Sequence, residues 1–584
     1  MSIYTELKQE LKQILKNAGY EVETLSLETS NRRDLGEYQL NDAMQLARTY
    51  KQNPREIAAK IVAELEKDDR FTNINIAGPG FINISLSEKY AKDILNRINE
   101  DVFNNIDKKD YKKVVIDYGG ANVAKALHVG HLRSANIGEA LKRLALLLGY
   151  DALGDAHLGD YGRPLGLVLR EIKARYPDLE YFDENYEGDF SEVELPITNA
   201  DLEIIYPYAS NKSKEDEQYL EEARDITLRI QKHEKGYYDL WKRVVDISKE
   251  DIKKTYADLN VSFEIWNGES DEMEFFDDLK KIYEEKNLLV ESEGARVVEV
   301  ATDEDKAPMP PLLFIRSNGV ASYETTDLAA ILERKVNFNP DEMWYVVDGR
   351  QALHFEQTFR AARKADLISD EVVLEHVGFG TMNGKDGKPF KTRDGGVMSL
   401  KSLMDLVYQE TYKKITNESL VGEEKESVAK TVAMAALKYA DLLPYRGTDY
   451  IFEVEKFSDL EGKTGPYLLY STIRMKSLLN KAIEQGIEFK EVKELKGETE
   501  KDLVLTLLYL PDLLDKSLEA KSLNEIADYI YKLTSIYNKF YSEHKVLVEE
   551  NKDLQESWLV LTNVIYKVNM LLLDVLGIKV PNKM

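Results

Sequence analysis

Apolar residues recur with different spacings along the chain, and the spacing sets the N-terminal region apart from the rest. Within residues 1–18 and 40–66 they return every three or four positions, which predicts two amphipathic helices. Segment 71–87 alternates apolar and polar residues on both sides of a Gly-Pro-Gly sequence, which predicts two strands joined by a turn. We expect residues 1–108 to form a small α+β unit, with the charged segment 107–112 as a linker.

The pattern then changes to alternating strands and helices. Residues 114–118 predict a short apolar strand, a glycine-rich turn follows, and helical spacing runs from about 130 to 148. A strand, turn and helix in this order open an α/β nucleotide-binding layer. The polar segment 216–257 also has helical spacing. We predict a Rossmann-type parallel-sheet domain over residues 109–430.

Helical spacing covers almost all of residues 431–584, which predicts an all-α helical bundle. The predicted fold class is therefore α/β: a Rossmann-type parallel-sheet domain, a small α+β N-terminal domain and an all-α C-terminal bundle. No apolar run approaches the length of a membrane span, and the N-terminal segment lacks the apolar core of a signal peptide. We expect a cytoplasmic protein that contacts no membrane.

Composition narrows the chemistry. The 584 residues include no cysteine, which excludes disulfides, zinc–cysteine sites and thiol nucleophiles. The formal charge of −27 disfavours a protein that coats nucleic acid, but not one that docks a folded RNA through local basic patches. Residues 178–225 hold 16 acidic against 3 basic residues, whereas residues 457–584 hold 20 against 17. A phosphate-binding surface therefore fits the C-terminal part better, and we interpret 178–225 as a solvated insertion with no assigned function.

The sequence His128-Val129-Gly130-His131 lies between the first strand of the central domain and its helix. Unpaired backbone N–H groups and the helix dipole attract phosphate to such a helix start. Gly130 lacks the Cβ atom that would hold an adenine ring or phosphate away. The two histidines, three positions apart, can point to one side and donate to triphosphate oxygens. Alternatively, they are ordinary histidines in a turn.

The surroundings of this motif resemble the arginyl-tRNA synthetase family of class I aminoacyl-tRNA synthetases. The segment ANVAKALHVGHLRSANIGEALKRL is similar to the family's signature. Other similar segments follow in the family's order: HLGDYGRPLG, LNVSFEIWNGES, SYETTDLAAILER, RQALHFEQTF, HVGFGTMNGKDGKPFKTRDGG and GPYLLYSTIR. The resemblance implies an N-terminal additional tRNA-binding domain (1–108), a catalytic domain (109–430) with the acidic insertion, and an anticodon-binding bundle (431–584).

The implied reaction joins L-arginine to its tRNA through arginyl-adenylate, with ATP as substrate and Mg²⁺ carried by ATP. The resemblance implies that His128, Gly130 and His131 contact ATP. It places Lys391, Thr392 and Arg393 where class I enzymes have their second signature, although the second lysine of that signature is absent here. Lys125 would then supply the missing positive charge; alternatively, it is a surface lysine. No fixed metal site is expected.

A guanidinium group calls for carboxylates and an aromatic wall. Tyr323 and Asp327 are four positions apart at the predicted start of a helix, so they share one side. By resemblance they bind the arginine side chain, Asp117 contacts it where the family has glutamate, and Asn122 and Gln351 hold the amino-acid end. The alternative for Asp327 is a helix cap beside two threonines.

The predicted tRNA contacts on the bundle are Tyr467, Arg474 and Lys476, which supply aromatic and basic groups for a loop nucleotide. The expected partners are L-arginine, ATP and the tRNA for arginine, with no DNA and no obligate protein partner, and family analogy favours a monomer. Three other functions stay open: a catalytically inactive tRNA-binding paralogue, another class I amino-acid-activating enzyme, and an adenylate-forming enzyme that acts on a small molecule without RNA.

Overall fold

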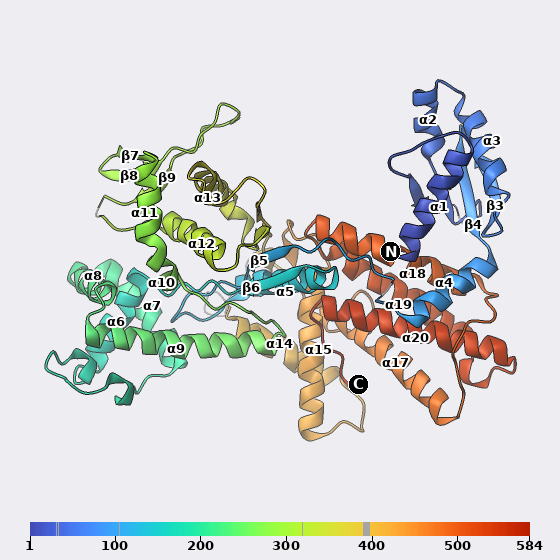
Figure 1. Cartoon of the computed structure of the whole chain (residues 1–584). Coiled ribbons are helices and arrows are strands. Elements are labelled where there is room, and N and C mark those ends of the chain that lie inside the picture. Colours follow the sequence, from blue (N-terminus) through green and yellow to red (C-terminus); the bar gives the residue numbers. More distant parts are fainter. Residues whose placement is uncertain (31, 33, 104, 318, 389, 391–397) are drawn as a thin grey trace.

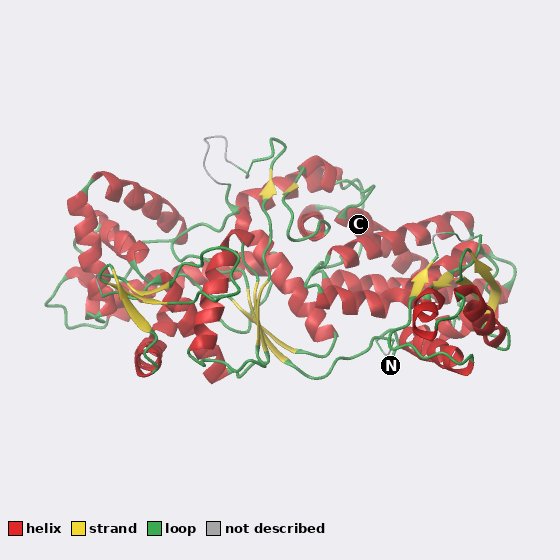
Figure 2. Ribbon diagram, turned by 90° about the horizontal axis from the view of Figure 1, so that it is seen from above, coloured by secondary structure: helices red, strands yellow, loops and turns green. Residues whose placement is uncertain are grey.

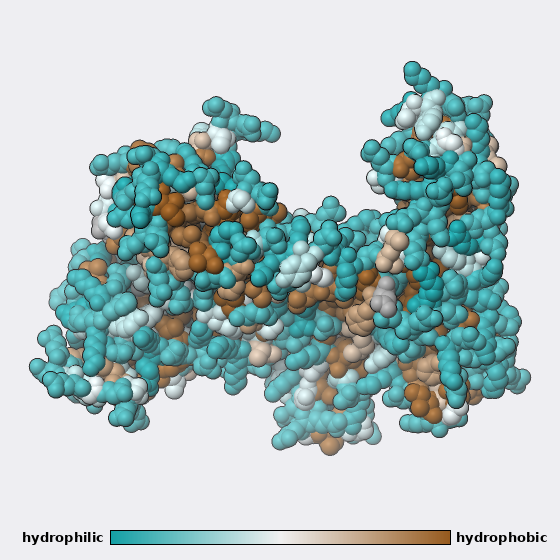
Figure 3. Space-filling view, in the orientation of Figure 1, coloured by the Kyte–Doolittle hydropathy of each residue, from teal (hydrophilic) through white to brown (hydrophobic). Residues whose placement is uncertain are grey.

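The computed structural model describes residues 1–30, 32, 34–103, 105–317, 319–388, 390 and 398–584. Three parts follow one another across the molecule (Figure 1): a lobe built on a parallel sheet, a helical bundle, and a small N-terminal unit that stands on the bundle. Figure 3 shows a deep notch between the first lobe and the N-terminal unit, with hydrophobic residues gathered on the lobe over α12 (Tyr323–Asn337).

The N-terminal unit is an antiparallel sheet with helices packed on it. Its strands lie in the order β1-β2-β4-β3, and the turn between β3 and β4 is at the predicted Gly-Pro-Gly. Its elements are α1 (Ile3–Asn17), β1 (Leu27–Thr29), β2 (Tyr38–Leu40), α2 (Asp42–Tyr50), α3 (Pro54–Leu65), β3 (Phe71–Ala77), β4 (Phe81–Leu86) and α4 (Glu88–Glu100). The prediction of a single helix over 40–66 is wrong. Lys51 ends α2 in the left-handed conformation, with φ of 52°, and Asn53 caps α3 ahead of Pro54.

The central lobe contains the predicted parallel sheet. Its strands are β5 (Lys113–Asp117), β6 (Asp151–Asp155), β10 (Glu342–Tyr345) and β11 (Val373–His376), in the order β11-β10-β5-β6. Helix α5 (Val129–Leu147) follows β5, as predicted. The chain leaves β5 towards β6 on one side, and β10 pairs with β5 on the other. The carboxyl ends of β5 and β10 therefore flank a topological switch point, where ligands bind in sheets of this kind.

Long insertions join β6 to β10. The first contains α6 (Arg163–Arg175), α7 (Asn199–Glu215), α8 (Glu217–Gln231) and α9 (Lys235–Asp258). It is followed by α10 (Glu269–Glu272), α11 (Phe276–Glu285) and an antiparallel sheet that the sequence did not predict, of β7 (Leu289–Ser292), β8 (Ala295–Val298) and β9 (Leu312–Ile315). Helices α12 (Tyr323–Asn337) and α13 (Ala352–Lys364) flank β10.

The C-terminal part is helical, as predicted, and its helices run beside the lobe and beneath the N-terminal unit (Figure 2). They are α14 (Leu400–Lys414), α15 (Gly422–Leu442), α16 (Val454–Phe457), α17 (Gly465–Glu484), α18 (Glu498–Glu519), α19 (Asn524–Glu543) and α20 (Lys552–Val575). By length and composition α20 could cross a membrane, but 72% of its most apolar window is buried. It is a core helix of this bundle.

Gly138 of α5 lets that helix lie directly on β5. A Cβ atom there would lie 2.2 Å from Cγ of Tyr118, whose ring is buried and whose hydroxyl donates to Glu139 and to the carbonyl of Ser262. Because the ring is held at both ends, Gly138→Ala should destabilise the protein by about 1–3 kcal/mol. The measurement is the midpoint of thermal unfolding. At an unobstructed helix position the same change stabilises by up to about 1 kcal/mol, so an unchanged or higher midpoint would contradict the packing argument.

Candidate active site

The two histidines of the first motif form a close pair at the start of α5, with their ring planes tilted by 38°. His128 is the N-cap residue, and its Nδ1 accepts the backbone N–H of Gly130 at 3.1 Å. Nδ1 of His131 accepts the backbone N–H of His128 at 2.9 Å. The ring centroids lie 3.9 Å apart. The pair therefore satisfies two backbone donors of the helix start and shares one side of it.

This hydrogen bonding fixes how the rings can act. Since each Nδ1 accepts a hydrogen bond, the proton of each neutral ring is on Nε2. Burial lowers the pKa of both histidines, and for His131 the neighbouring His128 and Lys125 help to lower it to about 3. Both rings are therefore neutral near pH 7 and offer an Nε2–H donor to an anion.

Gly130 is required at this point for a reason that the sequence did not indicate. A Cβ atom on it would lie 2.9 Å from Cε1 of His128 and 3.0 Å from Nδ1. Any larger residue would push the His128 ring away from the helix start. The absence of a Cβ atom at Gly130 therefore allows the His128 ring to approach the backbone closely, in addition to any room that it leaves for a ligand.

For the second predicted phosphate-binding segment, the structure describes only the residues on either side. Lys391, Thr392 and Arg393 lie outside the described residues. Ser399 forms an antiparallel bridge with His128, and the N–H of Leu400 donates to the carbonyl of Leu127 at 2.7 Å. The chain that leaves this segment is therefore paired with the chain that enters α5.

Ser134 of the signature joins the two strands at the switch point. Its hydroxyl accepts the N–H of Gly119 at 2.8 Å and donates to the carbonyl of Val346 at 2.7 Å. Gly119 follows β5 and Val346 follows β10. This buried serine therefore fixes the edges between which a ligand would lie.

Tyr323 and Asp327 meet the same histidine, which confirms that they share one side of α12. Nε2 of His354 lies 2.5 Å from Oδ2 of Asp327, and its ring centroid lies 5.1 Å from that of Tyr323. Burial lowers the pKa of His354, but the hydrogen bond and charge of Asp327 outweigh it, so the pKa is raised overall. The side chain that caps α12 is Ser322, so the alternative reading of Asp327 as a cap is wrong.

Asp117 lies at the end of β5 and is already paired within the protein. Nη2 of Arg334 lies 2.7 Å from Oδ2 of Asp117 and 2.7 Å from Oδ2 of Asp155, and all three side chains are buried. Burial raises the pKa of Asp117, although Arg334 opposes this. The sequence did not indicate this internal guanidinium. It ties the carboxyl ends of β5 and β6 to α12.

The two remaining residues of the predicted amino-acid site border the same region. Asn122 forms a parallel bridge with Gly159, and a Cβ atom on Gly159 would lie 2.6 Å from Oδ1 of Asn122. Gln351 ends a short 3-10 helix (Gly349–Gln351) three positions before His354. Both side chains reach solvent.

Sequence reasoning missed acidic groups beside Tyr323 and Asp327, where Glu269 is half-buried and Glu272 is buried. The carboxyl group of Glu269, at the start of α10, has no hydrogen bond or ion pair within the described part of the chain, and burial raises its pKa to about 7. The charges of Asp160 and Asp327 add to that rise. Glu272 lies 2.7 Å from Nδ1 of His157, and its pKa is raised to about 8, first by burial. Glu269 lies in one of the family-like segments and Glu272 two positions beyond its end, but their burial was the missing signal.

On the bundle, the residues predicted to contact tRNA already form hydrogen bonds with other side chains of the protein. The hydroxyl of Tyr467 accepts from Asn538 at 2.8 Å, and Arg474 donates to the same asparagine. The guanidinium of Arg474 also lies 4.7 Å from the ring centroid of Tyr541. Lys476 donates to Asn582 at 3.3 Å. All three residues belong to α17, and the guanidinium of Arg474 lies between the rings of Tyr470 and Tyr541.

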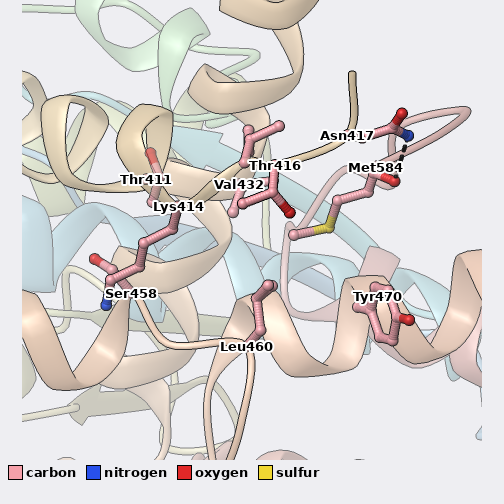
Figure 4. Close-up of a pocket in the computed structure, with 10 residues that line it drawn as sticks. Thr411, Lys414, Thr416, Asn417, Val432, Ser458, Leu460, Tyr470 and Met584 are labelled. Carbon is pink, nitrogen blue, oxygen red and sulfur yellow. Dashed lines mark hydrogen bonds between the residues drawn. The ribbon is translucent and has the colours of Figure 1, made fainter. Parts of the chain in front are cut away.

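A pocket of about 240 Å³ opens beside α17 where the C-terminus folds back (Figure 4). Nδ2 of Asn417 donates to the carbonyl of Met584 at 3.0 Å, and Tyr470 lies on the opposite wall. Tyr470 is 45% exposed. The end of the chain is thus part of the surface that α17 presents.

Comparison with known proteins gives matches along the whole chain. Residues 5–86 match the arginyl tRNA synthetase N terminal domain, 93–454 the class I (R) tRNA synthetase catalytic domain, and 468–584 the DALR anticodon binding domain. Arginine–tRNA ligases of Alkaliphilus oremlandii and Agathobacter rectalis are 40% and 41% identical, with 98% and 99% of each chain covered.

Solved structures share the fold. The crystal structure of arginyl-tRNA synthetase from Plasmodium falciparum matches with a TM-score of 0.80 and 24% identity over 99% of both chains. The Thermus thermophilus arginyl-tRNA synthetase matches with a TM-score of 0.77 and 20% identity over the whole of both chains. At these identities the likeness concerns the arrangement of all three parts, and the relatives above carry the evidence of kinship.

Proposed function

The chain belongs to the arginyl-tRNA synthetase family of class I enzymes, and from this premise we propose how its residues divide the reaction. The activity is that of an arginine–tRNA ligase. L-Arginine and ATP give arginyl-adenylate and pyrophosphate, and the arginyl group then passes to the 2′-hydroxyl of the terminal tRNA adenosine. Neither step needs a covalent enzyme intermediate. Alignment and stabilisation of charge are the main tasks.

The His128 and His131 pair is proposed to bind the triphosphate. Two neutral rings at the start of a helix direct Nε2–H donors outward, and the helix dipole favours an anion there. As pyrophosphate departs, these donors meet growing negative charge. Lys125, Lys391, Thr392 and Arg393 are proposed to complete this group. The bridge between Ser399 and His128 supports this, because it joins the chain that follows residues 391–397 to the start of α5.

The pocket of Tyr323, Asp327 and Glu269 is proposed to bind the arginine side chain. Asp327 offers a carboxylate beside an aromatic ring, and Glu269 adds an unpaired one. Asn122 and Gln351 border the pocket where the amino-acid end would lie. Asp117 is proposed to act mainly through Arg334, because its carboxylate is already occupied. The observation that carries the assignment is this cluster of acidic and aromatic side chains at the sheet edge from which α5 begins.

The pKa of Glu269 predicts a pH dependence of arginine binding. Below pH 7 this carboxyl is protonated and neutral, and above pH 7 it is ionised, whereas arginine stays a cation throughout. The KM for arginine should therefore fall roughly fivefold to tenfold between pH 6 and pH 8, as expected for gaining one partly solvated charge pair. The measurement is the arginine KM at saturating ATP and tRNA across this range. Glu269→Gln should give a higher arginine KM that does not change with pH. If this variant keeps the pH dependence of the parent enzyme, Glu269 does not bind the arginine side chain.

The partner that remains is tRNA. We propose that Tyr467, Arg474 and Lys476 on α17 contact the anticodon loop and that residues 1–108 contact the body of the tRNA. The proposed domain boundaries stay at 1–108, 109–430 and 431–584. By analogy with the family, the enzyme is proposed to act as a monomer, and the cytoplasm is proposed as its location.

Mg²⁺ is proposed to enter with ATP. Within the described residues, no group of three His, Asp or Glu side chains is arranged to hold a metal ion. A resident ion would need such oxygen ligands, whereas Mg²⁺ bound by phosphates keeps most of its own water. When bound, the ion would supply positive charge to the phosphates, and the histidine pair would orient them.

The test of the whole proposal is adenylation measured with each amino acid, with and without tRNA. Among the amino acids, only arginine should support ATP–pyrophosphate exchange, and it should do so only when cognate tRNA is present. Exchange that does not depend on arginine, or transfer of another amino acid to tRNA, would overturn it. An intact fold with no exchange at all would favour the inactive tRNA-binding paralogue.

A further inference from the structure

The acidic insertion is packed against the turn that carries Lys125. Val123 and Ala124, each 1% exposed, share one apolar cluster with Leu202 and Ile205 of α7. The N–H of Ala124 donates to Oγ of Ser248 on α9 at 3.1 Å. The turn before the first motif therefore rests on residues 199–258 and not on the parallel sheet alone.

Ala124 shows that this packing imposes a conformation on the turn. Its φ is +59°, in the left-handed region that a residue with a Cβ atom rarely adopts. Such a backbone persists only where its surroundings enforce it. The buried contacts of Val123 and Ala124 do so, and the next side chain, Lys125, is thereby turned towards α7.

Lys125 meets an aromatic ring there instead of an acid. Its Nζ lies 4.6 Å from the ring centroid of Tyr206, which is half-buried on α7. Within the described residues Lys125 forms no ion pair. Residues 178–225 hold 16 acidic side chains, so a carboxylate partner would have been easy to supply. A carboxylate would cancel the charge of the ammonium and repel a triphosphate, whereas a ring holds the ammonium and leaves its charge available.

The held ammonium lies near the phosphate-binding pair. Lys125 lies three positions before His128 in the turn that enters α5. Burial lowers the pKa of both histidines, and the charge of Lys125 lowers it further. A lysine side chain that is already fixed beside the two histidines loses less conformational entropy when ATP binds. Its charge is then in place to stabilise the transition state.

We propose that Tyr206 of the acidic insertion is a positioning residue that holds the Lys125 ammonium at the ATP phosphate site. The inference rests on the proposed role of Lys125 in the reaction. It gives the insertion a task that its composition did not suggest. Through Tyr206 and the packed turn, residues 199–258 set the geometry of a positive charge that the second signature supplies in other class I enzymes.

The test measures adenylate formation, as ATP–pyrophosphate exchange with arginine and tRNA present, over a range of ATP concentrations. Tyr206→Leu should lower kcat/KM for ATP about tenfold, the size expected for losing one partly desolvated cation–π contact. Tyr206→Phe keeps the ring and should stay within about twofold of the parent enzyme. Tyr208→Leu is the matched control, because Tyr208 lies two positions on along α7, is 47% exposed and faces Arg175 and Lys212 instead.

A second background separates positioning from folding. In Lys125→Met the change Tyr206→Leu should have no further effect on kcat/KM for ATP, because the ring has no ammonium to hold. An equal loss in both backgrounds, or a rate increase in Tyr206→Leu, would overturn the inference. If Lys125→Met lowers the rate and Tyr206→Leu does not, the inference fails while the proposed role of Lys125 stands. If Lys125→Met has no effect, that role fails as well.

Discussion

Replacing His131 by alanine is expected to slow adenylate formation by about 10²–10⁴, the range found when one preorganised transition-state contact is removed. The ring of His131 is neutral, because its pKa is lowered to about 3, and its Nδ1 is occupied by the N–H of His128. Only Nε2–H remains to meet the charge that develops on the phosphates. The measurement is the single-turnover rate of arginyl-adenylate formation at saturating ATP, arginine and tRNA.

His131→Ala also removes a hydrogen-bond acceptor from the start of α5, so a second variant is needed. The side-chain oxygen of His131→Asn can still accept the N–H of His128, but the amide does not reach the position of Nε2. We expect the asparagine variant to be as slow as the alanine variant and to unfold at nearly the parent temperature. Unchanged adenylation in either variant would remove His131 from the catalytic group.

The sequence predicted the elements around this pair because their signals are local. The apolar run that becomes β5, the helical spacing of α5 and the histidines between them occur within one short stretch. The error over 40–66, where one helix was predicted and two are present, is also local. The apolar spacing resumes after Pro54, and the helix is interrupted between, where Lys51 is left-handed and Asn53 is extended. The spacing of apolar residues indicates which face of a helix is buried, but it does not indicate where the helical backbone is broken.

The charges of the site could not be predicted in the same way, since their partners are remote in sequence. Arg334 is 217 residues from Asp117 and 179 from Asp155, and it occupies a carboxylate that the family resemblance assigned to the substrate. Glu269 gave no signal, because nothing in a sequence tells a solvated glutamate from one whose pKa burial raises to about 7. Electrostatic roles follow from burial and pairing, and these appear only in the folded chain.

The pairing of Asp327 with His354 leads to the second large effect. Asp327→Asn should raise the KM for arginine by on the order of 10², because a desolvated carboxylate that meets a cation is lost while its neighbours stay buried. The KM for ATP should stay nearly unchanged, since His128 and His131 lie on a different element. The measurement is both KM values at saturating concentrations of the other substrates.

Glu324→Gln serves as the control for this variant, since it removes a charge from the same turn of α12 and lies near enough to His354 to affect its pKa. If the arginine KM depends on a contact and not on the total charge, Glu324→Gln should change it less than about threefold, as for a partly solvated charge. Comparable increases in the KM values of arginine and ATP in Asp327→Asn would show that Asp327 serves the fold. A selective increase, together with a smaller one in Glu324→Gln, would place the guanidinium of the substrate against Asp327, where His354 holds the carboxylate and Tyr323 forms the wall.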